Sequence, residues 1–250
     1  MGIEEQVEAF RIAFRAAGLA KRAEGEKAYL KSQLDFHGVT VPFIRSAAER
    51  FRREHPNLTR AELIAIATGL WRTNFHDLHS LAIALLELYA ERLELKDMAF
   101  LENLLRRSHT WDHVDWLSIR VVGALAERCP AAKRTLKRWS KDENFWIRRA
   151  SMLALHDPLR AGRGDFDLFA RFASGMVEEK EFFIRKAIGW VLREVSKKRP
   201  EPVYRFLSKQ IGQVSGLTLR EGSKYLPKAQ KAELLRRHRA EKGRYPGTAG

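Results

Sequence analysis

The sequence predicts an all-α protein built from repeated helical hairpins. Apolar residues recur at three- and four-residue spacing in segments of about 10 to 18 residues, which is the periodicity of amphipathic helices. Alternating β-branched runs are few, and no Asn-Gly or Asp-Gly pair lies between two apolar segments, so strand hairpins are not expected. One helical segment also recurs further along the chain, which predicts that the helices stack.

Glycine and proline divide the chain into roughly a dozen short antiparallel helices. The clearest of them, in chain order, are expected at residues 6–15, 42–54, 61–71, 78–92, 112–128, 146–155 and 182–197. From Lys228 the composition becomes strongly basic. We expect a last helix in the first half of that segment and a frayed tail over the final eight residues, which contain Gly, Pro and Ala.

An internal repeat sets the expected architecture. Five residues recur in the same order 37 residues later: Phe145, Ile147, Arg148, Ala150 and Leu155 correspond to Phe182, Ile184, Arg185, Ala187 and Leu192. Periods of about 30 to 50 residues in a helical chain are typical of stacked hairpins of the HEAT or armadillo type, whose neighbouring repeats share one core. We therefore expect a right-handed solenoid with a concave face. Residues 1–227 would form a single domain, and residues 228–250 a basic C-terminal helix and flexible tail.

The composition excludes several classes of protein. With 250 residues, of which 45% are hydrophobic and 31% charged, the chain resembles a globular protein and neither a disordered nor a collagen-like one. No apolar run approaches the roughly 20 residues of a membrane span, and the acidic amino terminus is unlike a secretory signal, so a cytoplasmic protein is expected. The single cysteine, Cys129, excludes an internal disulfide and a cysteine-based metal cluster, and its neighbours predict a buried thiol.

The charge balance points to a polyanionic partner. Lys and Arg number 46 against 31 Asp and Glu, which gives a net charge of +15. Nucleic acid is the commonest partner of such a protein inside cells, because each neutralised phosphate releases condensed counterions. Anionic lipid and acidic proteins are the alternatives, and charge alone does not choose among the three. The sequence lacks the GxxxxGKS/T, GxGxxG and GxSxG motifs, which disfavours nucleotide hydrolysis, dinucleotide redox chemistry and serine hydrolysis.

The helix expected at residues 182–197 carries an apolar and a basic face. At 100° per residue its apolar side chains form one stripe, which we expect to be buried: Ile184, Ile188, Val191 and Val195. A tryptophan lies among cations on another face: Lys186, Trp190, Arg193 and Lys197. Two interpretations stay open. Either Trp190 packs against the next repeat beside solvated cations, or it is presented to a polyanion or a cationic ligand among phosphate-binding side chains.

Trp111 and Asp115 form a second candidate site. They are four residues apart, so on a helix their side chains project side by side. Asp115 would border the apolar stripe of that helix and be partly desolvated. The spacing alone favours a structural interpretation, in which Asp112 caps the helix and Asp115 follows three residues later, as in a capping box.

Two histidine pairs have spacings that occur in metal sites. His109 and His113 are four residues apart, and His76 and His79 are three apart. Neither pair has the glutamate of the HExxH motif, so we expect scattered surface histidines and no metal. A helical-repeat metalloenzyme that uses these four histidines is the alternative.

Five segments, in order along the chain, resemble one known family. The most specific is KEFFIRKAIGWVLRE at residues 180–194, and the others are GVTVP at 38–42, TWDHVD at 110–115, DENFWIRRA at 142–150 and LTLREGSKYL at 217–226. From Tyr29 to Leu226 the sequence resembles the DNA alkylation repair proteins of the AlkD type, which are DNA glycosylases built from HEAT-like repeats. His113 and the basic segment after Lys228 match no feature of that family.

The resemblance implies a reaction and the residues that perform it. The family's catalytic Trp and Asp, four residues apart, and its second Trp fall on Trp111, Asp115 and Trp190. Tyr29 and Arg149 match its supporting positions, and both are expected to contact DNA. The reaction is hydrolysis of the N-glycosidic bond of cationic alkylated purines, such as N3-alkyladenine and N7-alkylguanine, in duplex DNA, without base flipping or a cofactor. Cations on or beside the concave basic face are expected to contact DNA: Arg149, Lys186, Arg193, Lys197, Arg220 and Lys224.

The expected protein is thus a monofunctional glycosylase. We expect a monomer, associated with the nucleoid in the cytoplasm, that acts on alkylated duplex DNA and needs neither a membrane nor an obligate protein partner. The alternative is a non-catalytic HEAT-repeat scaffold that binds nucleic acid or an acidic protein, since most solenoids bind without catalysing. Retention of Trp111, Asp115 and Trp190 favours the enzyme.

Overall fold

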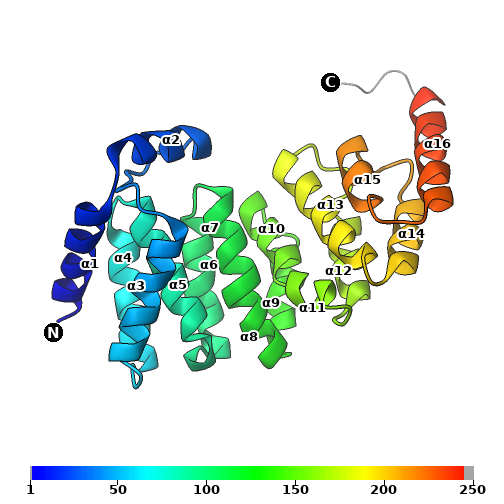
Figure 1. The fold of residues 1–250 in the computed structure, drawn as a ribbon. Coiled ribbons are helices and arrows are strands. Elements are labelled where there is room, and N and C mark those ends of the chain that lie inside the picture. Colours follow the sequence, from blue (N-terminus) through cyan, green and yellow to red (C-terminus); the bar gives the residue numbers. More distant parts are fainter. Residues whose placement is uncertain (1, 245–250) are drawn as a thin grey trace. The chain divides into compact units, whose positions relative to one another are not determined.

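The computed structural model describes residues 2–244, and these are helical from α1 (Ile3–Ala17) to α16 (Lys228–Arg244) (Figure 1). Within this part of the chain no strand forms, and the one extended pairing is an isolated bridge between Asp35 and Phe75. The predicted all-α class is therefore confirmed. No helix among the described residues is long and apolar enough to cross a membrane.

The chain divides into two compact units, residues 1–132 and 133–250. The single domain over residues 1–227 stays a prediction. Each unit is a set of short helices joined by tight turns. The first unit contains α1, α2 (Ala20–Leu30), α3 (Val41–Glu54), α4 (Arg60–Arg72), α5 (His76–Leu88), α6 (Met98–Arg106), α7 (Trp111–Trp116) and α8 (Gly123–Arg128). The second contains α9 (Ala132–Trp139), α10 (Phe145–Leu153), α11 (His156–Arg160), α12 (Phe166–Ser174), α13 (Phe182–Ser196), α14 (Pro200–Lys209), α15 (Gly216–Gly222) and α16.

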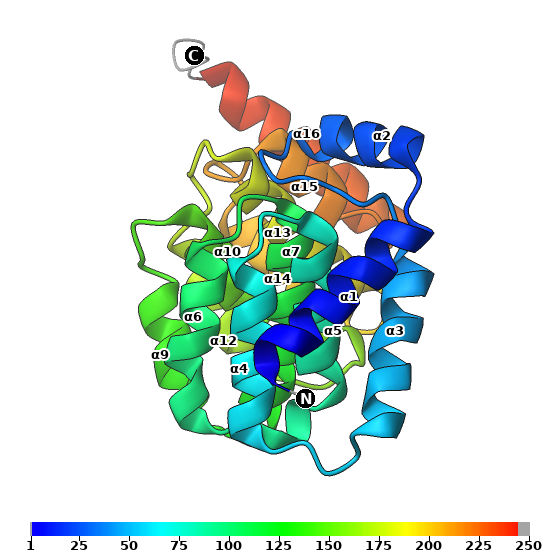
Figure 2. The ribbon, with the colours of Figure 1, turned by 90° about the vertical axis from the view of Figure 1, so that its left-hand side faces the viewer.

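The core of the first unit is built around α5. Every residue of α5 from His76 to Leu86 is buried, because α3, α4 and α7 pack on different sides of it. Figure 2 shows α1 crossing α4 obliquely on the outside of this layer. A helix that is apolar on all sides is typical of a protein interior. The first turn of α5 nevertheless carries three polar residues, His76, Asp77 and His79, and these meet the segments that carry the candidate site.

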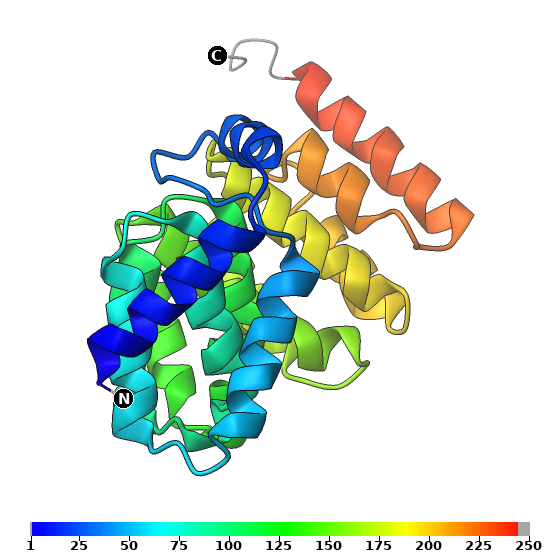
Figure 3. The ribbon, with the colours of Figure 1, turned by 60° about the vertical axis from the view of Figure 1, so that its left-hand side comes forward.

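The core of the second unit is built around α13. The predicted stripe of Ile184, Ile188, Val191 and Val195 is buried, as expected from its spacing. α13 and α15 lie side by side (Figure 3). Gly189 permits this close approach, since a Cβ at that position would lie 2.8 Å from Glu221 Cβ and 3.3 Å from Thr218 Cα. The Thr218 hydroxyl also donates to the carbonyl of Arg185 at 3.0 Å, which fixes α15 on α13.

Some helix bounds differ from those predicted. The helix expected at 78–92 ends at Leu88 and is followed by the 3₁₀ turn Ala90–Arg92. The helix expected at 112–128 begins at Trp111 and contains a π-helical segment, Leu117–Val122, between α7 and α8. Apolar periodicity does not distinguish π from α winding, since such segments are single turns within an otherwise regular helix.

The basic C-terminal segment is more regular than expected. α16 runs to Arg244 and so includes the first two of the eight residues predicted to be frayed, while 245–250 lie outside the described residues. Contacts with α14 explain this order: the Tyr204 hydroxyl donates to Glu233 at 2.7 Å, and the Arg237 guanidinium donates to the Ser208 carbonyl at 3.2 Å. The prediction for Cys129 is wrong, because this residue lies at the end of α8, beside an exposed proline, and is only partly buried.

Candidate active site

α7 presents Trp111 and Asp115 one helical turn apart, as their spacing predicts. Trp111 is partly exposed, whereas Asp115 retains only 9% of its accessible surface. The capping interpretation is wrong, because the helix begins one residue earlier than expected and its N-cap is Thr110. Asp112 lies inside the first turn and faces α5. Asp115 therefore does not have the capping role that the spacing suggested.

Tyr29 meets Trp111 from α2. The two ring centroids are 6.3 Å apart and the ring planes cross at 82°, which is the edge-to-face geometry that aromatic pairs prefer. Tyr29 is 74% exposed, and no residue of α2 is buried. An aromatic side chain left this open to solvent is available to a ligand. The structure thus brings together three of the residues predicted for the site: Tyr29, Trp111 and Asp115.

The prediction of scattered surface histidines is wrong for three of the four residues. His76, His79 and His113 are buried where α5 and α7 pack, and only His109 is exposed. The repeat contained the missing signal: His76 and His113 are 37 residues apart, the same separation as the repeated segments, so they occupy matching places in neighbouring hairpins. Their rings stack with centroids 3.9 Å apart and an interplanar angle of 19°.

Contacts in this histidine cluster fix its charge. Burial lowers the pKa of His113 well below its usual 6.5, and it lowers the pKa of His79 to about 4, so both imidazoles are neutral near pH 7. Asp112 Oδ2 lies 3.0 Å from His76 Nε2. Burial raises the pKa of the Asp112 carboxyl, but the contacts with His76, His113 and Thr110 together outweigh burial, and the pKa lies below its usual value. Asp112 is therefore a carboxylate at neutral pH.

The cluster resembles a metal site in composition but not in geometry. His76, Asp112 and His113 could each offer a ligand atom, and these atoms lie within 4.8 Å of one another. A bound ion would have to lie about 2.0 to 2.1 Å from an imidazole nitrogen, near the plane of that ring. Two stacked, nearly parallel rings cannot both meet this condition for one ion. The arrangement does not fit a metal held by both histidines.

Trp190 lies on α13 in the second unit. Its side chain is partly exposed, and its ring centroid is 4.8 Å from that of His156 on α11. Burial lowers the pKa of His156, so this imidazole is neutral near pH 7 and adds no positive charge beside the indole. As predicted, Trp190 lies outside the buried apolar stripe of its helix.

Arg149 is more enclosed than a phosphate-binding residue is expected to be. Only 3% of it is exposed, and its guanidinium donates to the backbone carbonyl of Phe183 and lies 5.9 Å from the centroid of the Phe183 ring. These contacts join α10 to the first turn of α13. In this conformation Arg149 holds the helix that carries Trp190, and its contact with DNA stays a prediction.

The other predicted cations differ in how accessible they are. Lys186 and Arg193 both pair with Glu221 on α15, and Lys197 pairs with Glu194 on its own helix. Lys197, Arg220 and Lys224 are exposed. Lys197 and Lys224 lie 5.2 and 5.7 Å from the centroid of the Tyr225 ring. The sequence analysis did not single out Tyr225. Its place between basic residues in the segment LTLREGSKYL was the available signal, because exposed aromatic rings among cations are common in nucleic-acid interfaces.

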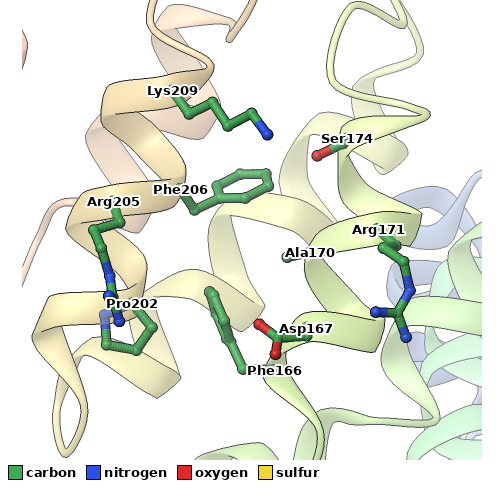
Figure 4. Close-up of a pocket in the computed structure, with 9 residues that line it drawn as sticks. All are labelled: Phe166, Asp167, Ala170, Arg171, Ser174, Pro202, Arg205, Phe206 and Lys209. Atoms are coloured by element: carbon green, nitrogen blue, oxygen red, sulfur yellow. The ribbon is translucent and has the colours of Figure 1, made fainter.

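A hollow in the second unit lies away from these residues. It encloses about 720 Å³ between α12 and α14 (Figure 4). The rings of Phe166 and Phe206 line it, as do three cations: Arg171, Arg205 and Lys209. None of the predicted site residues lines it.

Comparison with known proteins identifies the family. A family model described as "DNA alkylation repair enzyme" matches residues 10–226. The chain belongs to this family. It is therefore an enzyme of DNA alkylation repair, and DNA is its substrate. No curated protein matches the sequence.

Solved structures agree with this membership. A "Predicted DNA alkylation repair enzyme" from Enterococcus faecalis is 27% identical, with a TM-score of 0.76 over 84% of this chain and 97% of that one. AlkD2 from Streptococcus mutans is 15% identical, with a TM-score of 0.65 over 90% of this chain and 99% of that one. The protein smu.31 from Streptococcus mutans UA159 is 16% identical, with a TM-score of 0.57 over 74% of this chain and all of that one. The last two show the fold alone.

Proposed function

We propose that this repair enzyme is a monofunctional DNA glycosylase. It hydrolyses the N-glycosidic bond of cationic alkylated purines, such as N3-alkyladenine and N7-alkylguanine, in duplex DNA. Trp111, Asp115 and Trp190 are its catalytic residues. The observation that carries the proposal is the buried Asp115 carboxyl one turn from an indole that an exposed tyrosine meets edge to face.

The chemistry of the lesion limits what the enzyme must supply. Alkylation at N3 or N7 gives the purine a positive charge and makes it a good leaving group, so no strong general acid is required. As the bond breaks, positive charge moves onto the sugar in an oxocarbenium-like transition state. The enzyme therefore needs a fixed negative charge near the sugar and a position for water, which are the roles that carboxylates fill in glycoside hydrolysis.

Asp115 is suited to the first of these roles. Its carboxyl is held on a helix and largely shielded from solvent, and a charge in such a place acts more strongly than one in bulk water. In the proposed reaction Asp115 stabilises the sugar cation and orients the attacking water. The products are a free alkylpurine and an intact strand with an abasic site.

The aromatic residues are suited to a cationic lesion. The face of an indole attracts a cation by roughly 0.5 to 2 kcal/mol, depending on how dry the site is. Tyr29 and Trp111 are accessible at the surface, an arrangement compatible with a lesion that remains in the duplex. In the proposal Trp190 contributes a second indole face, an assignment that rests on the match of its IGW segment to the family.

In the proposal, exposed cations of the second unit bind the phosphate backbone of the DNA. Lys197, Arg220 and Lys224 lie at the surface on or beside α13 and α15, and the Tyr225 ring lies near the two lysines. Phosphate contacts of this kind fix the register of a protein on DNA and carry no sequence information. Sequence-independent binding of this kind is suited to an enzyme that must search for lesions in any sequence.

The decisive test is release of a free base. The purified protein is incubated with a duplex that contains one N7-methylguanine, and the free base is separated and measured together with the abasic sites formed. Stoichiometric release of N7-methylguanine from an unbroken strand is expected. Tight binding to the duplex with no base released above the uncatalysed rate would instead favour the non-catalytic scaffold.

A further inference from the structure

The helix that carries Trp111 and Asp115 has little to hold its first turn by itself. α7 is the N-terminal part of a continuous helix that runs through the π-helical segment Leu117–Val122 and α8 to Arg128, and its N-cap Thr110 makes no side-chain capping bond. The first N–H groups of a helix have no partner within the helix, so a first turn without a side-chain cap is held only weakly by the helix itself. The placement of the two side chains therefore depends on contacts that α7 makes with other elements.

Two successive residues of α7 supply such contacts. Asp112 Oδ2 lies 3.0 Å from His76 Nε2, and the His113 ring stacks on the His76 ring. His113 Nε2 is also 2.9 Å from the hydroxyl of Ser80. His76 and Ser80 are four residues apart and so lie on one face of α5. The first turn of α7 is thus attached to the first two turns of the most deeply buried helix of the unit.

His76 is itself fixed from the opposite side. The Phe36 ring stacks on the His76 ring at 4.4 Å with an interplanar angle of 14°, and the backbone N–H of His76 donates to the Asp35 carbonyl at 2.8 Å. Asp35 and Phe36 belong to the loop that follows α2, and α2 carries Tyr29. The same imidazole therefore contacts both the α2 loop and α7, the two elements whose aromatic residues meet at the candidate site.

We propose that His76 and Asp112 are positioning residues, which hold α7 so that Trp111 meets Tyr29 and the Asp115 carboxylate faces the reacting sugar. The inference rests on the proposed function, because that function gives Trp111 and Asp115 their roles. His76 and Asp112 act through α7 and do not touch the lesion. Loss of either contact allows α7 to shift, and misplacement of a reacting group by about 1 Å can cost as much as about 100-fold in rate.

The first experiment detects the position of Trp111 without any reaction. Indole N–H signals are recorded by ¹⁵N NMR for the wild type and for His76→Gln and Asp112→Asn, and the Trp111 signal is assigned with Trp111→Phe. We expect the Trp111 signal to shift or broaden in both variants, while the signals of Trp139 and Trp190 in the second unit keep their positions and report intact folding. His109→Gln is the matched control, since His109 is exposed two residues before Trp111. An unmoved Trp111 signal in the nearly isosteric Asp112→Asn variant would overturn the proposal.

The second experiment separates positioning from a general loss of structure. Single-turnover release of N7-methylguanine is expected to fall at least about 10-fold in each variant, while the Kd for the duplex changes by less than about twofold. Because both residues act through one contact, the double variant should be no slower than the slower single variant. Additive losses, or unchanged rates in both single variants, would overturn the assignment.

The two readouts also distinguish this proposal from the one on which it rests. If the wild type releases no base, the proposed function fails, while the NMR comparison still decides whether His76 and Asp112 hold α7. Treatment with a chelator tests the remaining alternative, which is that the histidine cluster binds a metal. If EDTA shifts the Trp111 signal of the wild type as the substitutions do, the cluster binds a metal and the positioning proposal is wrong.

Discussion

The rings of Tyr29 and Trp111 meet at 82° with their centroids 6.3 Å apart, although the residues lie on α2 and α7, and α3, α4, α5 and α6 lie between them along the chain. The contact is notable because Tyr29 buries little of its own surface in making it. An exposed ring that touches one partner edge to face stabilises the fold only slightly. Its more specific effect is to fix the orientation of Trp111.

We predict that Tyr29→Ala slows base release by about 2- to 10-fold, which corresponds to the roughly 0.5 to 1.5 kcal/mol of an aromatic pair. The free energy of unfolding should hardly change, because Tyr29 is mostly exposed. Single-turnover rates and urea denaturation measure the two quantities. Tyr29→Phe retains the ring and is the control. If it is as slow as Tyr29→Ala, the hydroxyl matters and not the ring contact.

Asp115→Asn should abolish base release while binding to the duplex survives. The substitution removes the negative charge but keeps the shape, and loss of one preorganised electrostatic group commonly costs about 100- to 1000-fold in rate. Release of N7-methylguanine and fluorescence-anisotropy binding are the measurements. Asp167→Asn is the matched control, because Asp167 is an exposed carboxylate that lines the hollow in the second unit. Excision by Asp115→Asn at close to the wild-type rate would refute the catalytic role.

The faces of individual helices could be predicted from the sequence. The buried stripe of α13 and the shared face of Trp111 and Asp115 follow from spacing within one helix, which a sequence shows directly. The stacking of His76 on His113 could not be predicted in this way, because it depends on how two hairpins are placed against each other. Burial of Arg149 is a similar case: the carbonyl of Phe183 that accepts from it lies 34 residues away in the chain. Contacts between repeats determine the stacking and burial of these side chains, and the sequence indicates such contacts mainly through its repeat period of 37 residues.

Binding to duplex DNA should weaken steeply with salt. Each phosphate contact contributes about 0.9 to the slope of log K against log salt concentration, so Lys197→Ala, Arg220→Ala and Lys224→Ala should each reduce the slope by about that amount. Arg205→Ala, in an exposed residue of α14, is the control and should leave the slope unchanged. Arg149→Ala should instead lower the free energy of unfolding, because this guanidinium is buried and bonded to a backbone carbonyl. A slope that does not depend on these exposed cations would place the DNA elsewhere on the protein.

Stability should fall as the pH decreases from about 6.5 to about 4. Burial lowers the pKa of His79 from 6.5 to about 4, so in this window the unfolded chain binds a proton that the folded chain does not. For His79 the loss is about 2 kcal/mol at pH 5 relative to pH 7. Urea denaturation at both pH values, followed by circular dichroism, measures it. His79→Gln should flatten the dependence, and His109→Gln, in an exposed residue, should not. An equal pH dependence in the wild type and His79→Gln would contradict the assignment.

The proposed hydrolytic mechanism predicts that no covalent adduct forms with the DNA. Glycosylases of the lyase type attack the sugar with an amine and pass through a Schiff base, which borohydride reduces to a stable protein–DNA adduct. Among the residues of the candidate site, Tyr29, Trp111, Asp115 and Trp190, none is an amine. Lys186, one turn before Trp190 on α13, is the lysine nearest to it in sequence, and its Nζ lies 3.7 Å from the Glu221 carboxylate. An ammonium group held in this pair is not a free amine nucleophile.

Reaction mixtures treated with borohydride should therefore contain no trapped adduct, and the abasic strand should stay unbroken. An adduct that forms with the wild type and is lost in Lys186→Ala would show that the amine, and not water, attacks the sugar.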